Sequence, residues 1–88
     1  MTTSSWTVYI LECADQTLYT GITRDLSRRI MEHNQGIGAK YTKGRGPMTI
    51  MYTETCADRS TALKQEIFIK KLSKQKKLSL IALSLIHI

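Results

Sequence analysis

Residues 6–12, with the sequence WTVYILE, and residues 18–22, with the sequence LYTGI, decide the fold of this chain. Both runs are rich in aromatic and β-branched side chains, which favour β-strands. The ADQT sequence at 14–17 has the composition of a tight turn, so the two runs are predicted to pair as a β-hairpin. Alternation along the first run puts large apolar side chains on both faces, and we therefore expect both faces of the sheet to be covered.

A helix is predicted directly after the hairpin. Thr23 or Asp25 can cap its N-terminus, and it runs to about Asn34. Leu26 and Ile30 form its buried stripe.

The second half of the chain contains one more strand and two more helices. A glycine-rich, basic segment at 35–47 is predicted as a loop or a short helix, and a strand at 48–54 follows it. The next helix begins at Asp58 or Ser60, and the last one begins at about residue 73. Four apolar side chains are expected on the inner side of the first of these helices: Ala62, Leu63, Ile67 and Leu72.

The length and the order of elements indicate one small α+β domain. Chains usually split into several domains only beyond about 250 residues, whereas this one has 88. The predicted order, ββαβαα, corresponds to a small three-stranded, mostly antiparallel sheet flanked by helices. We expect the domain to span residues 6–81. Residues 82–88 form an apolar C-terminal tail that extends the last helix, provides a dimer patch or is a truncated end.

The charge of the chain points to a polyanionic partner. Thirteen Lys and Arg residues against seven Asp and Glu residues give a net charge of +6. An excess of this kind is typical of domains that bind nucleic acid, although solubility alone is an alternative explanation.

Several other function classes are excluded by composition. Cys13 and Cys56 form no CxxC pair, so a structural zinc site is not expected. No signal sequence opens the chain, which predicts a cytoplasmic protein with reduced thiols. The apolar end of the chain is shorter than the roughly 20 residues that a membrane span needs, so no membrane association is predicted.

A set of residues matches, in order, the motifs of one known family. Val8-Tyr9-Ile10 is followed by Tyr19-Thr20-Gly21; Arg29 and His33 lie on the next predicted helix, and Glu66 lies on a later one. On these residues the chain resembles the GIY-YIG nuclease domain over roughly residues 6–81. It is most similar to the small stand-alone bacterial members of that superfamily.

The resemblance implies hydrolysis of phosphodiester bonds with one divalent cation, Mg²⁺ or Mn²⁺. Glu66 matches the metal-ligand glutamate of the family. A hard cation that keeps many water ligands needs only one or two protein carboxylates, so a single glutamate is chemically sufficient. The alternative is an ordinary surface glutamate that pairs with Lys70, four residues later.

Arg29 matches the helix arginine of the family, which implies contact with the scissile phosphate through two parallel hydrogen bonds. The alternative is a solvated ion pair with Asp25, four residues earlier. Arg28 is the neighbour better suited to such a surface role.

Two tyrosines and a histidine complete the catalytic set that the resemblance implies. Tyr19 matches the tyrosine that the family is proposed to use to orient or deprotonate the attacking water, with Tyr9 beside it. His33 matches a histidine that can accept a proton directly or through Tyr19. The alternatives are tyrosines that only build the sheet and a histidine that only ends a helix. Gly21 would let the backbone come close to the site.

The chain departs from the family pattern in three places. The first motif is VYI rather than GIY, Ile22 stands where some branches have a lysine, and no asparagine follows Asn34. A late asparagine helps to hold the phosphate in some branches, and the sequence leaves its substitute open, with Lys40, Tyr41 and Lys74 as the candidates. The substrate-binding candidates, in addition to Gly21, are Lys40, Lys43, Arg45 and Lys74.

The sequence therefore predicts a metal-dependent endonuclease that hydrolyses DNA, selects its substrate by structure and takes part in DNA repair or processing. RNA is the alternative substrate. A DNA- or RNA-binding module that uses the same scaffold and cuts weakly or not at all is the alternative function. The sequence indicates no particular protein partner.

Overall fold

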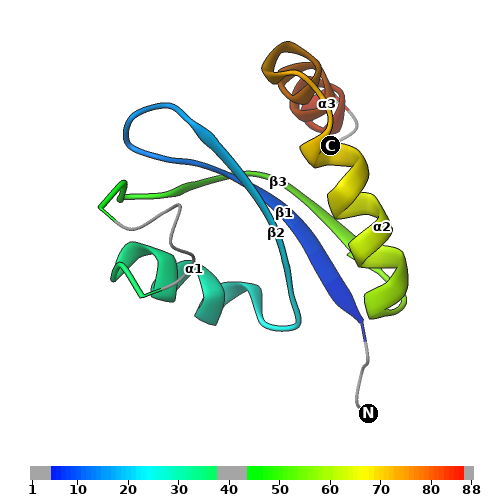
Figure 1. Ribbon diagram of the computed structural model, residues 1–88, viewed down its shortest axis with the longest axis horizontal. Coiled ribbons are helices and arrows are strands. Elements are labelled where there is room, and N and C mark those ends of the chain that lie inside the picture. Colours follow the sequence, from blue (N-terminus) through cyan, green and yellow to red (C-terminus); the bar gives the residue numbers. More distant parts are fainter. Residues whose placement is uncertain (1–4, 38–43, 87–88) are drawn as a thin grey trace.

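The computed structural model describes residues 5–37 and 44–86. Along the chain it contains β1 (Trp6–Glu12), β2 (Leu18–Thr23), α1 (Leu26–Asn34), β3 (Thr49–Cys56), α2 (Arg59–Lys70) and α3 (Lys74–Ile86) (Figure 1). This order and the antiparallel sheet confirm the predicted α+β class and the ββαβαα arrangement.

The sheet has the strand order β2-β1-β3, so β1 is central and pairs antiparallel with both neighbours. In the β1–β2 register, Tyr9 lies opposite Gly21 and Leu11 lies opposite Tyr19. Directly opposed residues point to the same face of a sheet. The tyrosines of the two predicted motifs therefore share one face and lie diagonally to each other.

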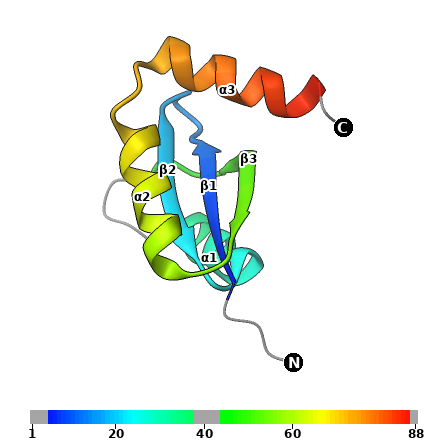
Figure 2. The same ribbon diagram turned by 90° about the vertical axis from the view of Figure 1, so that its right-hand side faces the viewer.

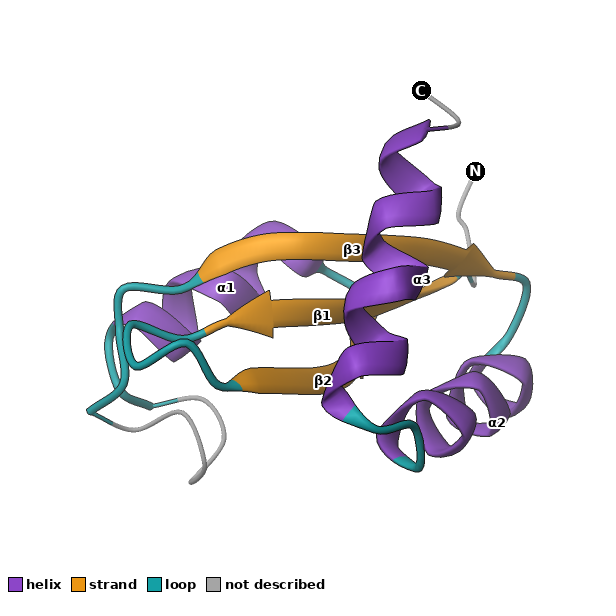
Figure 3. Cartoon of the chain, turned by 90° about the horizontal axis from the view of Figure 1, so that it is seen from above, coloured by secondary structure: helices purple, strands orange, loops and turns teal. Residues whose placement is uncertain are grey.

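Helices cover both faces of the sheet, as the alternation along β1 predicted. In Figure 3, α3 crosses in front of the strands, α1 lies behind them and α2 lies beyond the β2 edge. Figure 2 shows α3 lying across the strands at one end of the sheet. The arrangement leaves β2 as the edge strand that runs between α1 and α2.

Each face of β1 belongs to a separate apolar cluster. On one face Val8 and Ile10 pack with Ala62 and Ile69 of α2 and with Ile81 of α3. Fully burying one such side chain contributes about 1.5–3 kcal/mol to folding, which makes this cluster the main anchor of α2 and α3.

The opposite face of β1 carries the second cluster. Tyr9 and Leu11 pack there with Cys13 and Met48, and the α1 side chains Leu26 and Ile30 cover them. The predicted buried stripe of α1 is thus confirmed.

Two aspartates define where α1 and α2 begin. The Asp25 carboxylate accepts a hydrogen bond from the Arg28 backbone N–H at 3.1 Å, and the Asp58 carboxylate accepts one from the Thr61 backbone N–H at 2.8 Å. Each satisfies a backbone donor that the first turn of a helix leaves unpaired. Of the two caps that the sequence allowed for each helix, the aspartate is used in both cases.

The inner side of α2 differs from the prediction at one position. Ile67 is 51% exposed, whereas Ile69 is fully buried, so the expectation that Ile67 lies inside was wrong. The buried stripe passes through Ala62 and Ile69, which are two helical turns apart. At 100° per residue, Ile67 lies about 140° away from Ala62 around the helix axis.

The C-terminal segment predicted as a tail continues α3, because this helix runs without interruption to Ile86. Residues 82–86 therefore extend the last helix, whereas residues 87 and 88 lie outside the described part of the chain; a role of this segment as a dimer patch stays a prediction. Within residues 5–37 and 44–86, none of the helices has the length and apolar character needed to span a bilayer.

Candidate active site

Three aromatic side chains meet on the face of the sheet that α1 covers. The Tyr9 hydroxyl lies 2.9 Å from Nε2 of His33, within hydrogen-bonding distance. The ring centroid of Tyr19 lies 5.1 Å from that of His33 and 6.3 Å from that of Tyr9. Residues from β1, β2 and α1 that the sequence singled out therefore form one contiguous cluster.

Burial controls the protonation of the Tyr9–His33 pair. Both residues are 1% exposed. Burial raises the pKa of Tyr9 to about 12. Burial, followed by the positive charge of Arg29, lowers the pKa of His33 below its usual value. Both groups are therefore neutral at pH 7, and the imidazole tautomer decides which of them donates the hydrogen bond.

The exposure of the two tyrosines separates their possible roles. Tyr19 is half-buried, whereas Tyr9 is almost completely enclosed. A group that contacts substrate must be reachable from solvent, so Tyr19 is the phenol of this pair that is placed to meet a ligand.

Gly21 makes the close tyrosine pair possible. A Cβ atom at this position would lie 2.6 Å from the Tyr9 hydroxyl oxygen and 3.1 Å from Cε2 of Tyr19. The Tyr9 ring thus lies across β2 above a residue with no side chain. The space left by Gly21, which the sequence suggested for a ligand or another backbone, is occupied by the two tyrosines themselves.

Arg29 extends from α1 beside this cluster. Its guanidinium lies near enough to the Tyr9 phenol to favour the ionised phenol, which partly offsets the effect of burial on the pKa of Tyr9. Its Nη1 also lies 3.0 Å from Oε1 of Glu32. About one third of the Arg29 side chain remains exposed, so the guanidinium can reach a ligand while it stays anchored.

Arg28 occupies the surface position expected of it. Its side chain is 77% exposed and pairs with the other oxygen of Glu32 at 3.3 Å. Asp25, the alternative partner considered for Arg29, instead caps α1. Arg28 and Arg29 therefore share one acidic partner but differ in their distance from the tyrosines.

Glu66 approaches the same edge of the sheet from α2. This helix contacts β2 and β1, and its buried residues lie on the face opposite the tyrosine cluster. The carboxylate nevertheless acts across the β2 edge, because its charge is one of the causes, smaller than burial, that raise the pKa of Tyr9. Glu66 is thus near enough for its charge to act on Tyr9, although α2 packs on the face of the sheet opposite the tyrosines.

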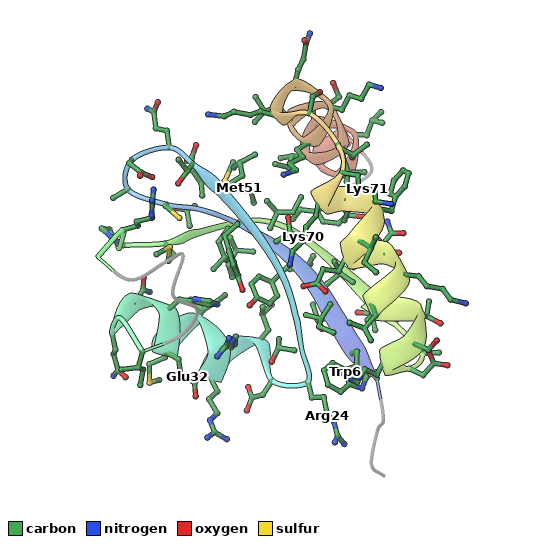
Figure 4. All side chains as sticks on the ribbon, viewed as in Figure 1. Trp6, Arg24, Glu32, Met51, Lys70 and Lys71 are labelled. Atoms are coloured by element: carbon green, nitrogen blue, oxygen red, sulfur yellow. The ribbon has the colours of Figure 1, made fainter. Side chains whose placement is uncertain are left out.

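Glu66 also forms the ion pair that was considered as its alternative role. Its Oε2 lies 3.2 Å from Nζ of Lys70, yet its side chain is only 15% exposed. Figure 4 shows Lys70 leaning from α2 toward the sheet, whereas Lys71 is directed away. Glu66 is therefore a largely buried carboxylate with one mobile cationic partner rather than a solvated surface glutamate.

The acidic side chains do not form a multi-ligand metal site. Within residues 5–37 and 44–86, no three His, Cys, Asp or Glu side chains gather closely enough to hold an ion by themselves. A cation at Glu66 would have to keep most of its water ligands, as Mg²⁺ commonly does.

Two of the four basic substrate-binding candidates, Arg45 and Lys74, are held at the β1–β2 turn rather than at this cluster. Arg45 pairs with Asp15, and the Lys74 ammonium donates to the Gln16 carbonyl at 3.0 Å, so both hold the β1–β2 turn. Lys40 and Lys43 lie outside the described residues. A phosphate contact from any of these four side chains remains a prediction.

Comparison with known proteins gives a match over the part of the chain that contains these residues. Residues 5–79 match the model of the GIY-YIG catalytic domain, a span that includes every member of the cluster and Glu66. This chain belongs to the GIY-YIG family. It is similar to a UPF0213 protein of Desulfotalea psychrophila, with 53% identity over 81 residues that cover 91% of this chain and 74% of the relative. A UPF0213 protein of Clostridium perfringens is 51% identical over 85% of this chain and 81% of its own length.

Solved GIY-YIG relatives share the fold. The solution NMR structure of a UPF0213 protein from Bacillus halodurans has a TM-score of 0.60 and 46% identity, and covers 90% of this chain and 84% of that protein. The solution NMR structure of an E. faecalis protein has a TM-score of 0.63 and 40% identity, over 97% of this chain and 93% of the other. These likenesses confirm the resemblance to small GIY-YIG proteins.

Two features of this GIY-YIG site were missed by sequence reasoning. Glu32 joins both arginines of α1, which its spacing of three and four residues from them would have revealed. The second feature is a pair of arginines around Trp6: the Cζ atoms of Arg24 and Arg59 lie 5.9 and 5.8 Å from the indole centroid. No local pattern connects positions 6, 24 and 59, so that grouping needed the fold.

Proposed function

We propose that this GIY-YIG protein is a metal-dependent endonuclease that hydrolyses phosphodiester bonds in DNA. The observation that carries the proposal is the gathering of two phenols, a neutral imidazole and a guanidinium on one face of the sheet, with a largely buried carboxylate on α2 whose charge acts on Tyr9. Each of these groups matches a position of the family motif, and together they supply the proton, charge and cation chemistry that phosphodiester hydrolysis requires.

Arg29 is assigned to the scissile phosphate. Its fork of donors can form two parallel hydrogen bonds to phosphate oxygens, and Glu32 limits the orientations that the side chain samples. A guanidinium fixed before the substrate arrives stabilises the charge that grows on phosphate in the transition state without further reorganisation.

Tyr19 is assigned to orient the attacking water, since it is the more exposed phenol of the pair. Tyr9 and His33 act behind it as positioning residues. Their mutual hydrogen bond fixes both rings, and the neutral imidazole is the nearest group that can receive a proton near neutral pH.

The donor set at Glu66 fits a hydrated divalent cation. One carboxylate with limited exposure is enough for Mg²⁺ or Mn²⁺ that keeps several waters. When bound, the cation would supply positive charge next to the phosphate and the leaving oxygen. Lys70 is half exposed, and its flexible side chain can return to solvent when a cation binds at Glu66.

The proposed substrate is DNA of irregular structure, such as branched or flapped DNA. Cutting such DNA would be a step of DNA repair or processing. The net charge of +6 favours contacts to phosphate, which give affinity without reading base sequence. Structured RNA offers the same backbone charge and is the other substrate to test.

A nucleic-acid-binding module that does not cut is the second candidate. Two observations favour it: Lys70 already neutralises the Glu66 carboxylate, and burial raises the pKa of Tyr9 to about 12, which makes that phenol a poor base. The same basic surface would serve either function.

Cleavage assays separate the two candidates. Purified protein is incubated with plasmid, branched DNA and structured RNA in Mg²⁺ or in EDTA, beside the Tyr19→Phe variant. We expect Mg²⁺-dependent cutting of branched DNA and a rate at least about tenfold lower for Tyr19→Phe, because the variant loses the hydroxyl that orients water. Binding without cutting would favour the module, and cutting that persists in EDTA would reject the metal-dependent mechanism.

A further inference from the structure

A groove lies next to the cluster, at the end of the sheet where β2 leads into α1. It has a volume of about 360 Å³ and is bounded by Trp6 and Ile22 on one side and by the first two turns of α1 on the other. Arg29 is part of its wall. A ligand whose phosphate contacts Arg29 can therefore extend from that contact into this groove.

The arginines in and beside the groove differ in whether a carboxylate pairs with them. Glu32 pairs with Arg28 and Arg29, and the Asp25 carboxylate caps α1. Among residues 5–37 and 44–86, no carboxylate lies within ion-pair distance of Arg24 or Arg59. The guanidinium of Arg24, which is part of the groove wall, and that of Arg59, which is not, lie over the indole of Trp6 instead. Figure 4 labels Trp6 and Arg24.

The Trp6 ring is held but not closely covered. Both guanidinium carbons lie almost 6 Å from its centroid, which is close to the outer limit of a cation–π contact. The indole is also half-buried against the apolar cluster of α2, which fixes its orientation. A planar ligand that stacks on the exposed part of this ring therefore meets two cations, whose Cζ atoms lie 5.9 and 5.8 Å from the ring centroid.

We propose that this groove binds an unpaired nucleotide next to the scissile phosphate, with the base stacked on Trp6 and its phosphates contacted by Arg24 and Arg59. This inference rests on the proposed function, and it names the substrate class as nucleic acid with a single-stranded segment. Aromatic rings that stack bases, flanked by cations that follow the backbone, are the general means by which proteins bind single strands without sequence preference. A fully paired duplex cannot offer a base to Trp6 unless that base leaves the stack, which costs a few kcal/mol.

The test uses the tryptophan itself as the probe, because the chain contains only one. A 12-nucleotide single-stranded oligothymidylate is titrated into the full chain in EDTA, where metal-dependent cutting cannot occur, and the indole fluorescence is recorded. We expect quenching by the single strand and much weaker quenching by a blunt duplex of equal length. A duplex that quenches as strongly would overturn the proposal.

Substitutions at the groove locate the contact. By anisotropy of a labelled oligothymidylate, Trp6→Ala is expected to weaken binding about 5- to 150-fold, the range for loss of one stacked base. Phe68→Ala, which removes an aromatic ring that is 56% exposed outside the groove, should leave the affinity unchanged. An equal affinity for Trp6→Ala and the parent chain would contradict the proposal.

A second variant keeps the test decisive if Trp6→Ala fails to fold. Arg24→Gln with Arg59→Gln leaves the indole and the core intact, and is expected to weaken binding at least about tenfold and to lower the salt dependence of binding. The double substitution Lys71→Gln with Lys76→Gln removes two exposed charges outside the groove and serves as the control for net charge. The outcome is separable from the nuclease proposal: quenching without any cleavage in Mg²⁺ would reject only the nuclease, and cleavage that is insensitive to the groove substitutions would reject only the groove.

Discussion

Replacing Glu66 by glutamine is expected to lower the single-turnover rate of DNA cleavage in Mg²⁺ by about 10²- to 10³-fold. The amide keeps the volume of the side chain and its place at the β2 edge, but it lacks the negative charge that would hold a hydrated cation. Affinity for DNA, measured in EDTA, should be unchanged or higher because a negative charge is removed and Lys70 is released from its partner.

The matched control for this change is Glu12→Gln. Glu12 is a half-buried glutamate at the end of β1 with the same chemistry, outside the tyrosine cluster. If both variants lost activity equally, or if Glu66→Gln cut DNA at the parent rate, Glu66 would not be the cation ligand. Thermal unfolding of each variant shows whether a loss of rate reflects a loss of folded protein.

Arg29→Gln is expected to lower the cleavage rate by about 10²- to 10³-fold as well, with a smaller effect on DNA affinity. Arg29 is placed to contact the phosphate most strongly when charge develops in the transition state, so its loss acts mainly on the turnover step. Lysine should not restore the rate, because a single ammonium cannot reproduce the two parallel hydrogen bonds of a guanidinium.

Arg28→Gln provides a close control for Arg29→Gln. The two arginines are adjacent, carry the same charge and share Glu32, but Arg28 is 77% exposed. Single-turnover assays should therefore show nearly normal cutting for Arg28→Gln. Equal losses for both variants would mean that general positive charge, rather than a defined phosphate contact, explains the result.

Residues far apart in the sequence could be assigned to one site because they occur in the same order as the motifs of the GIY-YIG family. Tyr9, Tyr19, Arg29 and His33 were all predicted and are brought together by the hairpin and α1. The local signals for strands, turns and aspartate caps were equally informative, and they fixed the element order correctly.

Properties that depend on three-dimensional surroundings could not be predicted in this way. The sequence does not reveal that Tyr9 is enclosed while Tyr19 is reachable, because that difference arises from the strand order, which puts Tyr9 on the central strand β1 and Tyr19 on the edge strand β2. Ile67 was predicted on the inner side of α2, but Ile69 lies there instead. This difference has a similar origin, since it depends on which face of the helix meets the sheet. Arg45 and Lys74 were chosen for charge alone, and the fold uses both at the β1–β2 turn.

Paramagnetic broadening by Mn²⁺ tests most directly whether a single cation site lies at the β2 edge. Mn²⁺ is titrated at low stoichiometry into ¹⁵N-labelled protein, and the amide signals are followed by NMR with Glu66→Gln as the control. The signals of Glu66, Lys70, Gly21 and Tyr19 should broaden first and together, and the substitution should abolish that effect. Broadening that begins at Asp15 or Asp58, or that is the same in Glu66→Gln, would contradict a shared site of tyrosines, arginine and glutamate.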